Sequence, residues 1–450
     1  MRQRDLNILA FAYVFPPDAG SGTYRTLYFA NHWEKQGDHV TVITVKEECL
    51  LSTASVDRSL CNEIHPAICV VRASARRPLQ KLLGVKSTFR RKTSTNEHPG
   101  SGRRSSQPKN STTHSILRPI KDTLTDLLSC PDEHIGWVPD AVRAGYRIAK
   151  ATRIDCIYAT GGPWSCLLAG AILSRLYGIP LVLDFRDPWV SNPNLNGKSV
   201  LSRWLQRKME SMCVSSSKIV IANTEELKQD FVSRYVSMDP SRFVTITNGF
   251  EDLPEEVNCS AEQFILVHAG ALYQPRNPLN FLRAVIELVK AGVIPAKTFR
   301  IQLIGGVSIE DPAVESELRC EVLRDVLEVI PRVSHGDALA LQRRASGLLL
   351  IQTGFPLQVP RKLYEYLSLA RPILTITEPH SATARTVNEL RLGYVAADDI
   401  ASIKRAIVAL YEQWKSGEPL SIDQQSLQAY DNRYLSARVR EIMLGISHRS

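Results

Sequence analysis

Two glycines near the start of the chain stand where a phosphate could bind. Gly20 and Gly22 lie in residues 19–23 (AGSGT), between an apolar run and a segment with helical spacing. Glycines permit close backbone approach, and the unpaired N–H groups of a helix N-terminus attract anions. The segment is not a dinucleotide fingerprint, because Arg25 stands where the third glycine would fall, and it lacks the Walker G-K-[ST]. A phosphate-binding loop and a plain tight turn are both open readings.

A second group of polar residues follows two further apolar runs. Ligands bind at the carboxyl ends of strands in an open parallel sheet, so this group is placed to hold an acceptor. Asp184 or Asp187 could orient an acceptor hydroxyl, whereas Arg186 between these two carboxylates could equally form a purely structural ion-pair cluster. The candidate acceptor-side residues are Thr160, Gly162, Trp164, Asp184, Arg186 and Asp187.

A third group lies in the second half of the chain. Gly270 ends an apolar run, Arg276 follows it, and Gly354 precedes a predicted helix that begins behind Pro360. Within that helix, Glu365 could reach a ribose diol while the helix N-terminus holds a diphosphate. Arg276 and Lys362 are the catalytic candidates, because cations there would stabilise a departing diphosphate. The alternative for Lys362 and Glu365 is an ordinary solvated helix face.

The elements that must position these residues alternate between strand and helix. Such alternation predicts an α/β fold in which parallel sheets are joined by crossover helices. Two doubly wound domains in tandem are expected, over residues 1–250 and 251–425, with a C-terminal helix in 426–450 that could pack back on the first domain. The predicted strands are Leu6–Tyr13, His39–Val45, Ile154–Ala159, Leu181–Asp184, Ile219–Ala222, Phe243–Thr247, Phe264–Ala269, Arg300–Ile304, Leu348–Ile351 and Ile373–Thr377.

Composition and cysteine usage indicate a folded cytoplasmic protein. The chain has 450 residues, 44% of them hydrophobic and 22% charged. The apolar run at Leu6–Val14 is too short to span a bilayer and has no small-residue cleavage site, so neither a secretory signal nor a membrane span is expected. Nine cysteines without a C-x-x-C pair favour free thiols over disulfides or a zinc site.

The net charge of +9 is concentrated in one segment. Residues 72–121 contain thirteen Lys or Arg and a single acid, a local charge of +12 that leaves −3 for the rest. Much of this segment lacks large apolar residues, which predicts a disordered loop. Its more apolar part, over 79–91, could lie on an anionic membrane surface or remain a solvated loop. Nucleic-acid binding is not expected, since Phe89 is the segment's single aromatic residue and cannot form a stacking platform.

Taken together, these segments resemble glycosyltransferase family 4, the retaining enzymes of GT-B fold. The motifs occur in the family's order, and two of them match a bacterial subgroup linked to surface-polysaccharide assembly. The resemblance implies two Rossmann-like doubly wound parallel-sheet domains that face a cleft. It rests on residues 15–25 (FPPDAGSGTYR), 184–189 (DFRDPW), 248–250 (NGF), 268–270 (HAG) with Arg276, and 362–367 (KLYEYL).

The resemblance also implies roles for particular residues in binding a nucleotide-sugar. Gly22 would face the donor diphosphate, Arg276 would bind it, and Glu365 would hydrogen-bond the ribose. Ser334 and His335 would lie near the base, and Gly354 would line the sugar pocket. The donor-side candidates are therefore Gly20, Gly22, Gly270, Arg276, Ser334, His335, Gly354, Lys362 and Glu365.

Three positions depart from the family pattern. Leu357 stands where the partner of Glu365 would be, since the family's paired glutamates are eight residues apart. Ala271 replaces a basic residue that often follows the strand glycine, and residues 161–163 (GGP) lack the histidine often found near the sugar. These departures leave open a catalytically degenerate GT-B partner subunit.

The expected function is sugar transfer from a nucleotide-sugar to a lipid-linked or polysaccharide acceptor, with retention of anomeric configuration. Cell-surface polysaccharide biosynthesis at the inner face of a bacterial membrane is the expected setting. No cofactor and no metal are expected, because Arg side chains and helix N-termini can supply the electrostatic stabilisation. A sugar-nucleotide epimerase, which can share the two-domain architecture, is the alternative enzyme class.

Overall fold

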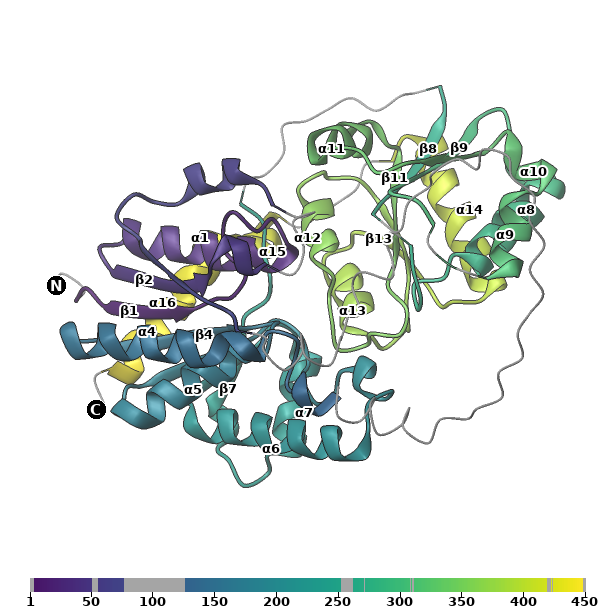
Figure 1. Ribbon diagram of the computed structural model, residues 1–450. Helices are drawn as coiled ribbons and strands as arrows, with labels where there is room; N and C mark the ends of the chain where they lie inside the picture. The colour runs from purple at the N-terminus through teal and green to yellow at the C-terminus, as the bar shows by residue number, and fades with distance from the viewer. Residues whose placement is uncertain are drawn as a thin grey trace, which may run out of the picture.

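Two α/β domains lie side by side in the computed structural model (Figure 1). The structure describes residues 4–50, 56–76, 126–251, 262–270, 272–307, 309, 311–418, 422 and 424–447. Most of the basic segment predicted over 72–121, as well as Ala271, lies outside these ranges. Within them, no helix is both long and apolar enough to cross a bilayer.

The first domain is built on a seven-stranded parallel sheet in the order β3-β2-β1-β4-β5-β6-β7. Long apolar runs form the central strands, and β1 lies between β2 and β4, so that Ile8 faces Val40 on one side and Cys156 on the other. The strands are β1 (Asn7–Phe11), β2 (His39–Val45), β3 (Cys69–Ala73), β4 (Cys156–Gly161), β5 (Leu181–Phe185), β6 (Ile219–Ala222) and β7 (Phe243–Thr245).

Helices cover both faces of this sheet. On one face, α4, α5 and α6 bury a core that includes Trp137, Leu167 and Cys213. On the other face, α1 and the C-terminal helix α16 bury Trp33, Val439 and their neighbours. The helices of this domain are α1 (Ser21–Lys35), α4 (Val138–Ala151), α5 (Ser165–Tyr177), α6 (Val200–Ser216), α7 (Glu225–Arg234) and α16 (Asn432–Ser447).

The second domain repeats the topology with six parallel strands in the order β10-β9-β8-β11-β12-β13. Its helices again pack on both faces, α8 and α14 over one core and α12 and α13 over the other. The strands are β8 (Phe264–Ala269), β9 (Phe299–Ile304), β10 (Leu327–Ile330), β11 (Gly347–Ile351), β12 (Ile373–Ile376) and β13 (Gly393–Ala396). The helices are α8 (Leu279–Lys290), α9 (Pro312–Leu318), α10 (Glu321–Arg324), α11 (His335–Arg344), α12 (Arg361–Leu367), α13 (Ala382–Glu389), α14 (Ile400–Ser416) and α15 (Gln424–Gln428).

Both sheets therefore have a doubly wound strand order, and the α/β class predicted from the sequence is confirmed. In each sheet the order reverses beside the first strand, between β1 and β4 and between β8 and β11. Ligands of open α/β sheets bind at these switch points, beyond the carboxyl ends of the strands.

The chain passes between the domains twice, and the two passages pair with each other. The Phe250 N–H donates to the Tyr430 carbonyl at 3.0 Å, and the Asn432 N–H donates to the Phe250 carbonyl at 3.0 Å. A side chain at Gly249 would collide with the Tyr430 carbonyl, which explains the glycine. Beyond this crossing, α16 is fixed to the first domain by a buried Arg440–Asp38 ion pair at 2.7 Å.

Candidate functional site

A cleft of about 720 Å³ lies between the two domains, at the carboxyl edges of both sheets. Its lining comes from the loops at both switch points, from α1 and α12, and from the interdomain crossing. The first domain and the crossing contribute Ser21, Gly22, Tyr24, Arg25, Tyr28, Gly162, Arg186, Asp187, Asn248, Gly249, Phe250, Glu251 and Asn432. The second domain contributes Tyr273, Arg276, Leu339, Arg343, Gln352, Gln358, Val359, Pro360, Arg361, Lys362, Tyr364, Glu365 and Ser368.

Gly22 lies in the first turn of α1 and directly contacts the side chain of Arg186. The Arg186 guanidinium donates to the carbonyls of Gly22 and Gly162, and its Nε donates to the Gly161 carbonyl at 3.2 Å. A Cβ at Gly22 would overlap this guanidinium. Arg186 thus joins the loop after β4 to the N-terminus of α1, while Gly20 precedes the helix and donates its N–H to Asp18 at 2.6 Å.

Asp184 lies in the interior of the first domain and does not reach the cleft. Its carboxylate pairs with Arg25, with Nε to Oδ2 at 2.8 Å and Nη2 to Oδ1 at 3.0 Å. Tyr158 and Thr160 also donate hydroxyls to Asp184, the latter at 3.0 Å. The ion-pair cluster left open from the sequence therefore exists, but its cation is Arg25 and not Arg186. Asp184, which also accepts from Thr160, therefore holds Arg25, and Arg25 itself lines the cleft.

Of the two carboxylates predicted for the acceptor side, Asp187 lines the cleft. Gly162 leaves room for it, since a Cβ there would stand 3.3 Å from the Asp187 Oδ2. Burial raises the pKa of Asp187, although the charges of Arg186 and Arg276 act in the opposite direction. Trp164 does not line the cleft, because its ring stacks on Trp189 at 5.8 Å and packs against the first-domain core.

Arg276 and Lys362 are two of the four cations with which the second domain lines the cleft. Burial and the nearby charge of Arg276 lower the pKa of Lys362 to about 8, although Glu365 acts in the opposite direction. Gly270 makes room for Lys362, since a Cβ at Gly270 would overlap the Lys362 Nζ. Arg276 lies over the rings of Tyr273 and Phe355, at 5.3 and 5.9 Å from their centroids.

Neither cation is neutralised by a carboxylate within ion-pair distance in the described part of the chain. The buried Nε of Arg276 also has no hydrogen-bond partner there. A buried donor without a partner costs about 1–3 kcal/mol, and like charges this close repel. This part of the cleft is therefore arranged to bind an anion.

Glu365 lines the cleft, and its carboxylate already forms an ion pair with Arg361. Its Oε1 is 3.2 Å from Arg361, one helical turn earlier in α12. The Arg361 guanidinium also lies 3.6 Å from the ring centroid of Tyr24 on α1, which connects the two domains across the cleft. A ribose diol at Glu365 would have to share this carboxylate with Arg361.

The loop after β11 is held by both domains. Gly354 adopts a positive φ of 82°, and its N–H donates to Glu378 at 2.6 Å. The Leu357 carbonyl accepts from the Thr224 hydroxyl at 2.7 Å, and the Leu357 side chain packs against the first-domain core. Gly354 and Leu357 therefore support the loop without lining the cleft themselves.

Helix α11 reaches the cleft through its later turns. Ser334 caps this helix by accepting from the Asp337 N–H at 3.1 Å, and His335 is its first residue. Leu339 and Arg343, further along the same helix, line the cleft, and sequence reasoning did not single them out. Helical spacing from residue 335 could have indicated them.

Gln352 is a further residue that sequence reasoning missed. It directly follows β11 at the switch point and is 1% exposed, yet neither its amide nitrogen nor its amide oxygen has a hydrogen-bond partner among the described residues. Nearby, burial and the charge of Lys362 lower the pKa of His268 well below its usual value, so the ring is neutral. The position of Gln352 after an apolar strand was the available signal.

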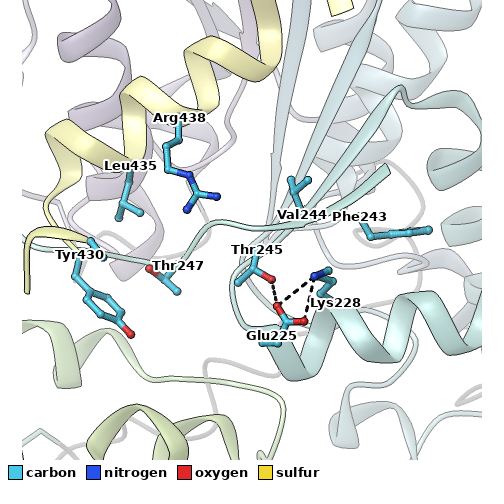
Figure 2. A pocket seen from close by; sticks show the side chains of 10 residues that line it. Glu225, Lys228, Phe243, Val244, Thr245, Thr247, Tyr430, Leu435 and Arg438 are labelled. Carbon is cyan, nitrogen blue, oxygen red and sulfur yellow. Dashed lines mark hydrogen bonds and ion pairs between the residues drawn. The ribbon is translucent and has the colours of Figure 1, made fainter. Parts of the chain in front are cut away.

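A separate hollow of about 450 Å³ lies beside the interdomain crossing (Figure 2). Its one acid, Glu225, is 3.1 Å from Lys228 and accepts from Thr245 at 2.7 Å, and Arg438 is the second base of the lining. Across the residues that the structure describes, no cluster of three His, Cys, Asp or Glu side chains could hold a metal ion.

Sequence and structure comparisons agree with this architecture. The model of Glycosyltransferase Family 4 matches residues 113–252. A 93-residue segment is 31% identical to the alpha-maltose-1-phosphate synthase of Mycolicibacterium smegmatis, covering 20% of this chain and 23% of that relative's length. The resemblance to glycosyltransferase family 4 is thereby confirmed over residues 113–252, while retention and the surface-polysaccharide subgroup stay predictions.

Solved structures share the two-domain fold over nearly the whole chain. A sucrose-phosphate synthase from Thermosynechococcus elongatus superposes with a TM-score of 0.64 and 13% identity, covering 99% of this chain and 100% of that one. WaaG, a glycosyltransferase involved in lipopolysaccharide biosynthesis, gives 0.54 and 13%, over 97% and 99%. The UDP-GlcNAc 2-epimerase of Neisseria meningitidis, bound to UDP-GlcNAc, gives 0.51 and 13%, over 98% and 100%. At these identities the likeness establishes the GT-B fold alone.

Proposed function

We propose that this protein is a glycosyltransferase that takes its sugar from a nucleotide-sugar bound in the interdomain cleft. The observation that carries the proposal is the pair of cations at Arg276 and Lys362. Burial and the charge of Arg276 lower the pKa of Lys362, and no described carboxylate lies within ion-pair distance of either cation. A diphosphate would relieve their repulsion, and the N-terminus of α1 at Gly22 lines the same cleft.

In the proposed reaction the two cations act on the leaving group. Negative charge grows on the diphosphate as the bond to the sugar breaks, and fixed cations stabilise that charge more than they stabilise the bound donor. Glu365 holds the ribose, and Gln352 supplies an amide to donor polar groups. The acceptor attacks from the face that the diphosphate leaves, which retains the anomeric configuration.

Asp187 is the proposed acceptor-side residue. It lines the cleft on the first domain, and its raised pKa suits a carboxylate that accepts a proton from, or orients, a hydroxyl. The charges of Arg186 and Arg276 both act on it, so it lies near the diphosphate site. In this proposal an acceptor hydroxyl at Asp187 of the first domain and donor phosphates at Arg276 and Lys362 of the second domain are held from opposite sides of the cleft.

The proposed reaction needs no metal, because Arg276, Lys362 and the N-terminus of α1 together offset the diphosphate charge. Activity should persist in excess chelator. If chelator abolishes activity and magnesium restores it, metal independence is refuted. That result would not contradict the proposed donor site.

The proposed acceptor is a lipid-linked or polysaccharide glycan, and the proposed setting is cell-surface polysaccharide assembly at the inner face of a bacterial membrane. Support comes from the subgroup motifs at residues 184–189 and 248–250, and from the fold relative WaaG, which is involved in lipopolysaccharide biosynthesis. The acceptor proposal is independent of the donor-site proposal and can fail separately.

The test is nucleotide release from UDP-, GDP- and ADP-sugars, each with and without a bacterial lipid extract. Release from one donor only when lipid is present is the expected result. Acceptor-independent epimerisation of the sugar would instead establish the epimerase, whose fold this chain shares. Nucleotide binding with no turnover of any donor would favour the degenerate subunit, which is motivated by Leu357 and Ala271 in the sequence.

A further inference from the structure

The first turns of helix α6 bury polar side chains, whereas its last turns place Cys213 and Val214 in the core. Its inward positions include Ser202, Gln206 and Glu210, all buried. Gln206 accepts from the Trp189 indole at 2.6 Å, and Glu210 accepts from the Val190 N–H at 2.9 Å. In the first turns of α6, the buried side is therefore polar.

The first turns of α6 present large apolar side chains to the outside. Val200, Leu201 and Trp204 are 75%, 50% and 53% exposed. Positions 200, 201, 204 and 208 lie on one side of a helix by their spacing. Clustered exposed apolar side chains of this size mark a contact surface more often than isolated ones do.

The same face is cationic. Arg207 and Lys208 are exposed beside Trp204, and the Lys208 ammonium lies 5.9 Å from the Trp204 ring centroid. Among the described contacts, neither Arg207 nor Lys208 pairs with a carboxylate. The one acid in α6 is Glu210, which is buried and paired with Arg234.

This face lies at the cleft end of the first domain. The chain leaves β5, passes the cleft-lining Arg186 and Asp187, and then begins α6 at Val200. A crossover helix starts at the edge where the preceding strand ends, so the apolar turns of α6 are at the carboxyl edge of the sheet. Figure 1 shows α6 along the outer side of the domain, with the sheet on its other side.

We propose that the N-terminal half of α6 docks the protein on an anionic lipid bilayer. Trp204, Val200 and Leu201 enter the interface between headgroups and acyl chains, and Arg207 and Lys208 contact the headgroup phosphates. The proposal deepens the proposed function, since a docked α6 would bring the cleft mouth toward a lipid-linked acceptor. It does not depend on turnover, because bilayer binding is measurable without donor.

The test uses the full chain and vesicles of phosphatidylcholine, with or without one-third phosphatidylglycerol. Binding is followed by vesicle flotation, and depth by quenching of tryptophan fluorescence with brominated lipids. The wild type should bind the anionic vesicles more strongly and show quenching. Trp204→Phe should keep most of the binding and lose most of the quenching, which locates the inserted indole.

Two double variants separate the apolar from the charged contribution. Leu201→Ser/Trp204→Ser and Arg207→Glu/Lys208→Glu should each weaken binding to anionic vesicles by about tenfold or more. Their matched controls are Val236→Ser/Val293→Ser and Lys297→Glu/Arg300→Glu, exposed changes of the same kind on other surfaces, which should leave binding within about twofold.

Two results would overturn the proposal. Binding that persists in both α6 variants, with no quenching assigned to Trp204, would mean that another part of the chain contacts the bilayer. A wild-type oligomer in the absence of lipid, converted to monomer by Leu201→Ser/Trp204→Ser without any change in vesicle binding, would make this face a subunit interface. Neither result would bear on the donor cleft, so this proposal and the proposed function fail separately.

Discussion

Lys362 is the residue whose charge should control nucleotide affinity. Its pKa is lowered to about 8, so the free protein loses this positive charge as the pH rises through that value. Only the protonated lysine attracts a diphosphate, and binding should therefore weaken above pH 8, by up to tenfold per pH unit until the pKa of the bound state is reached. Calorimetric titration with UDP, GDP and ADP between pH 7 and 9.5 measures this.

Lys362→Arg is the control for that measurement, because an arginine stays protonated throughout this range. Its affinity should be nearly independent of pH. An identical pH dependence in the wild type and in Lys362→Arg would assign the titration to another group and remove Lys362 from the donor site.

Asp184 and Asp187 are three residues apart, but removing their charges should change the free energy of unfolding by very different amounts. Asp184→Asn should lower the free energy of unfolding by about 3–5 kcal/mol, because it leaves the buried Arg25 without its counter-charge. Asp187→Asn should change it by no more than about 1 kcal/mol, since no described cation lies within ion-pair distance and burial already disfavours its charge. Urea unfolding measures both. Equal destabilisation by the two substitutions would contradict a structural role for Asp184 and a separate role for Asp187 in the cleft. Asp187→Asn should also slow sugar transfer.

At the scale of elements, the loop between β11 and α12 contacts both domains. Leu357 packs on the first-domain core, and its carbonyl accepts from Thr224. Leu357→Glu would match the family's paired glutamates, yet it should lower activity, because the new carboxylate would be desolvated at the domain contact. Leu357→Met, which keeps the volume, should retain activity. Activity gained in Leu357→Glu would show that the loop can turn this side chain toward the cleft.

The sequence predicted the long central elements well and the short ones poorly. His39–Val45 was predicted with the bounds that β2 has, because seven residues with an apolar face form a clear pattern. The edge strands β3, β10 and β13 were missed, since they have four or five residues and are only partly buried. Helix α4 was also missed, although its apolar spacing is helical.

Site residues could be predicted where they lie in loops at strand ends. They could not be predicted where the site depends on contacts between residues far apart in the sequence. Gly22, Arg276 and Lys362 come together at the cleft because parallel strands place their carboxyl ends at one edge. The pairing of Arg25 with Asp184 joins residues 159 positions apart, and no local pattern indicates it. The same holds for Gln352, whose unpaired amide is visible only in the packed structure.

At the scale of the whole molecule, the cleft is framed by contacts that join the two domains. Arg385 of α13 pairs with Glu226 of α7 through two hydrogen bonds, at 2.7 and 3.2 Å. Arg361 lies over Tyr24, and the two chain crossings pair at Phe250. Arg276 and Lys362 belong to one domain and Asp187 to the other, so in the proposed reaction the relative position of the domains sets the distance over which the sugar moves.

The central claim is that the cations of this cleft drive sugar transfer, and Arg276→Met tests it most directly. The methionine keeps an apolar chain beside Tyr273 and Phe355 and removes the charge. Acceptor-dependent nucleotide release should fall by about 10²–10³-fold with an unchanged unfolding midpoint, while Arg300→Met, an exposed change in the same domain, should release nucleotide at the wild-type rate. Release by Arg276→Met at the wild-type rate would contradict the account, because the cleft would then not hold the leaving diphosphate.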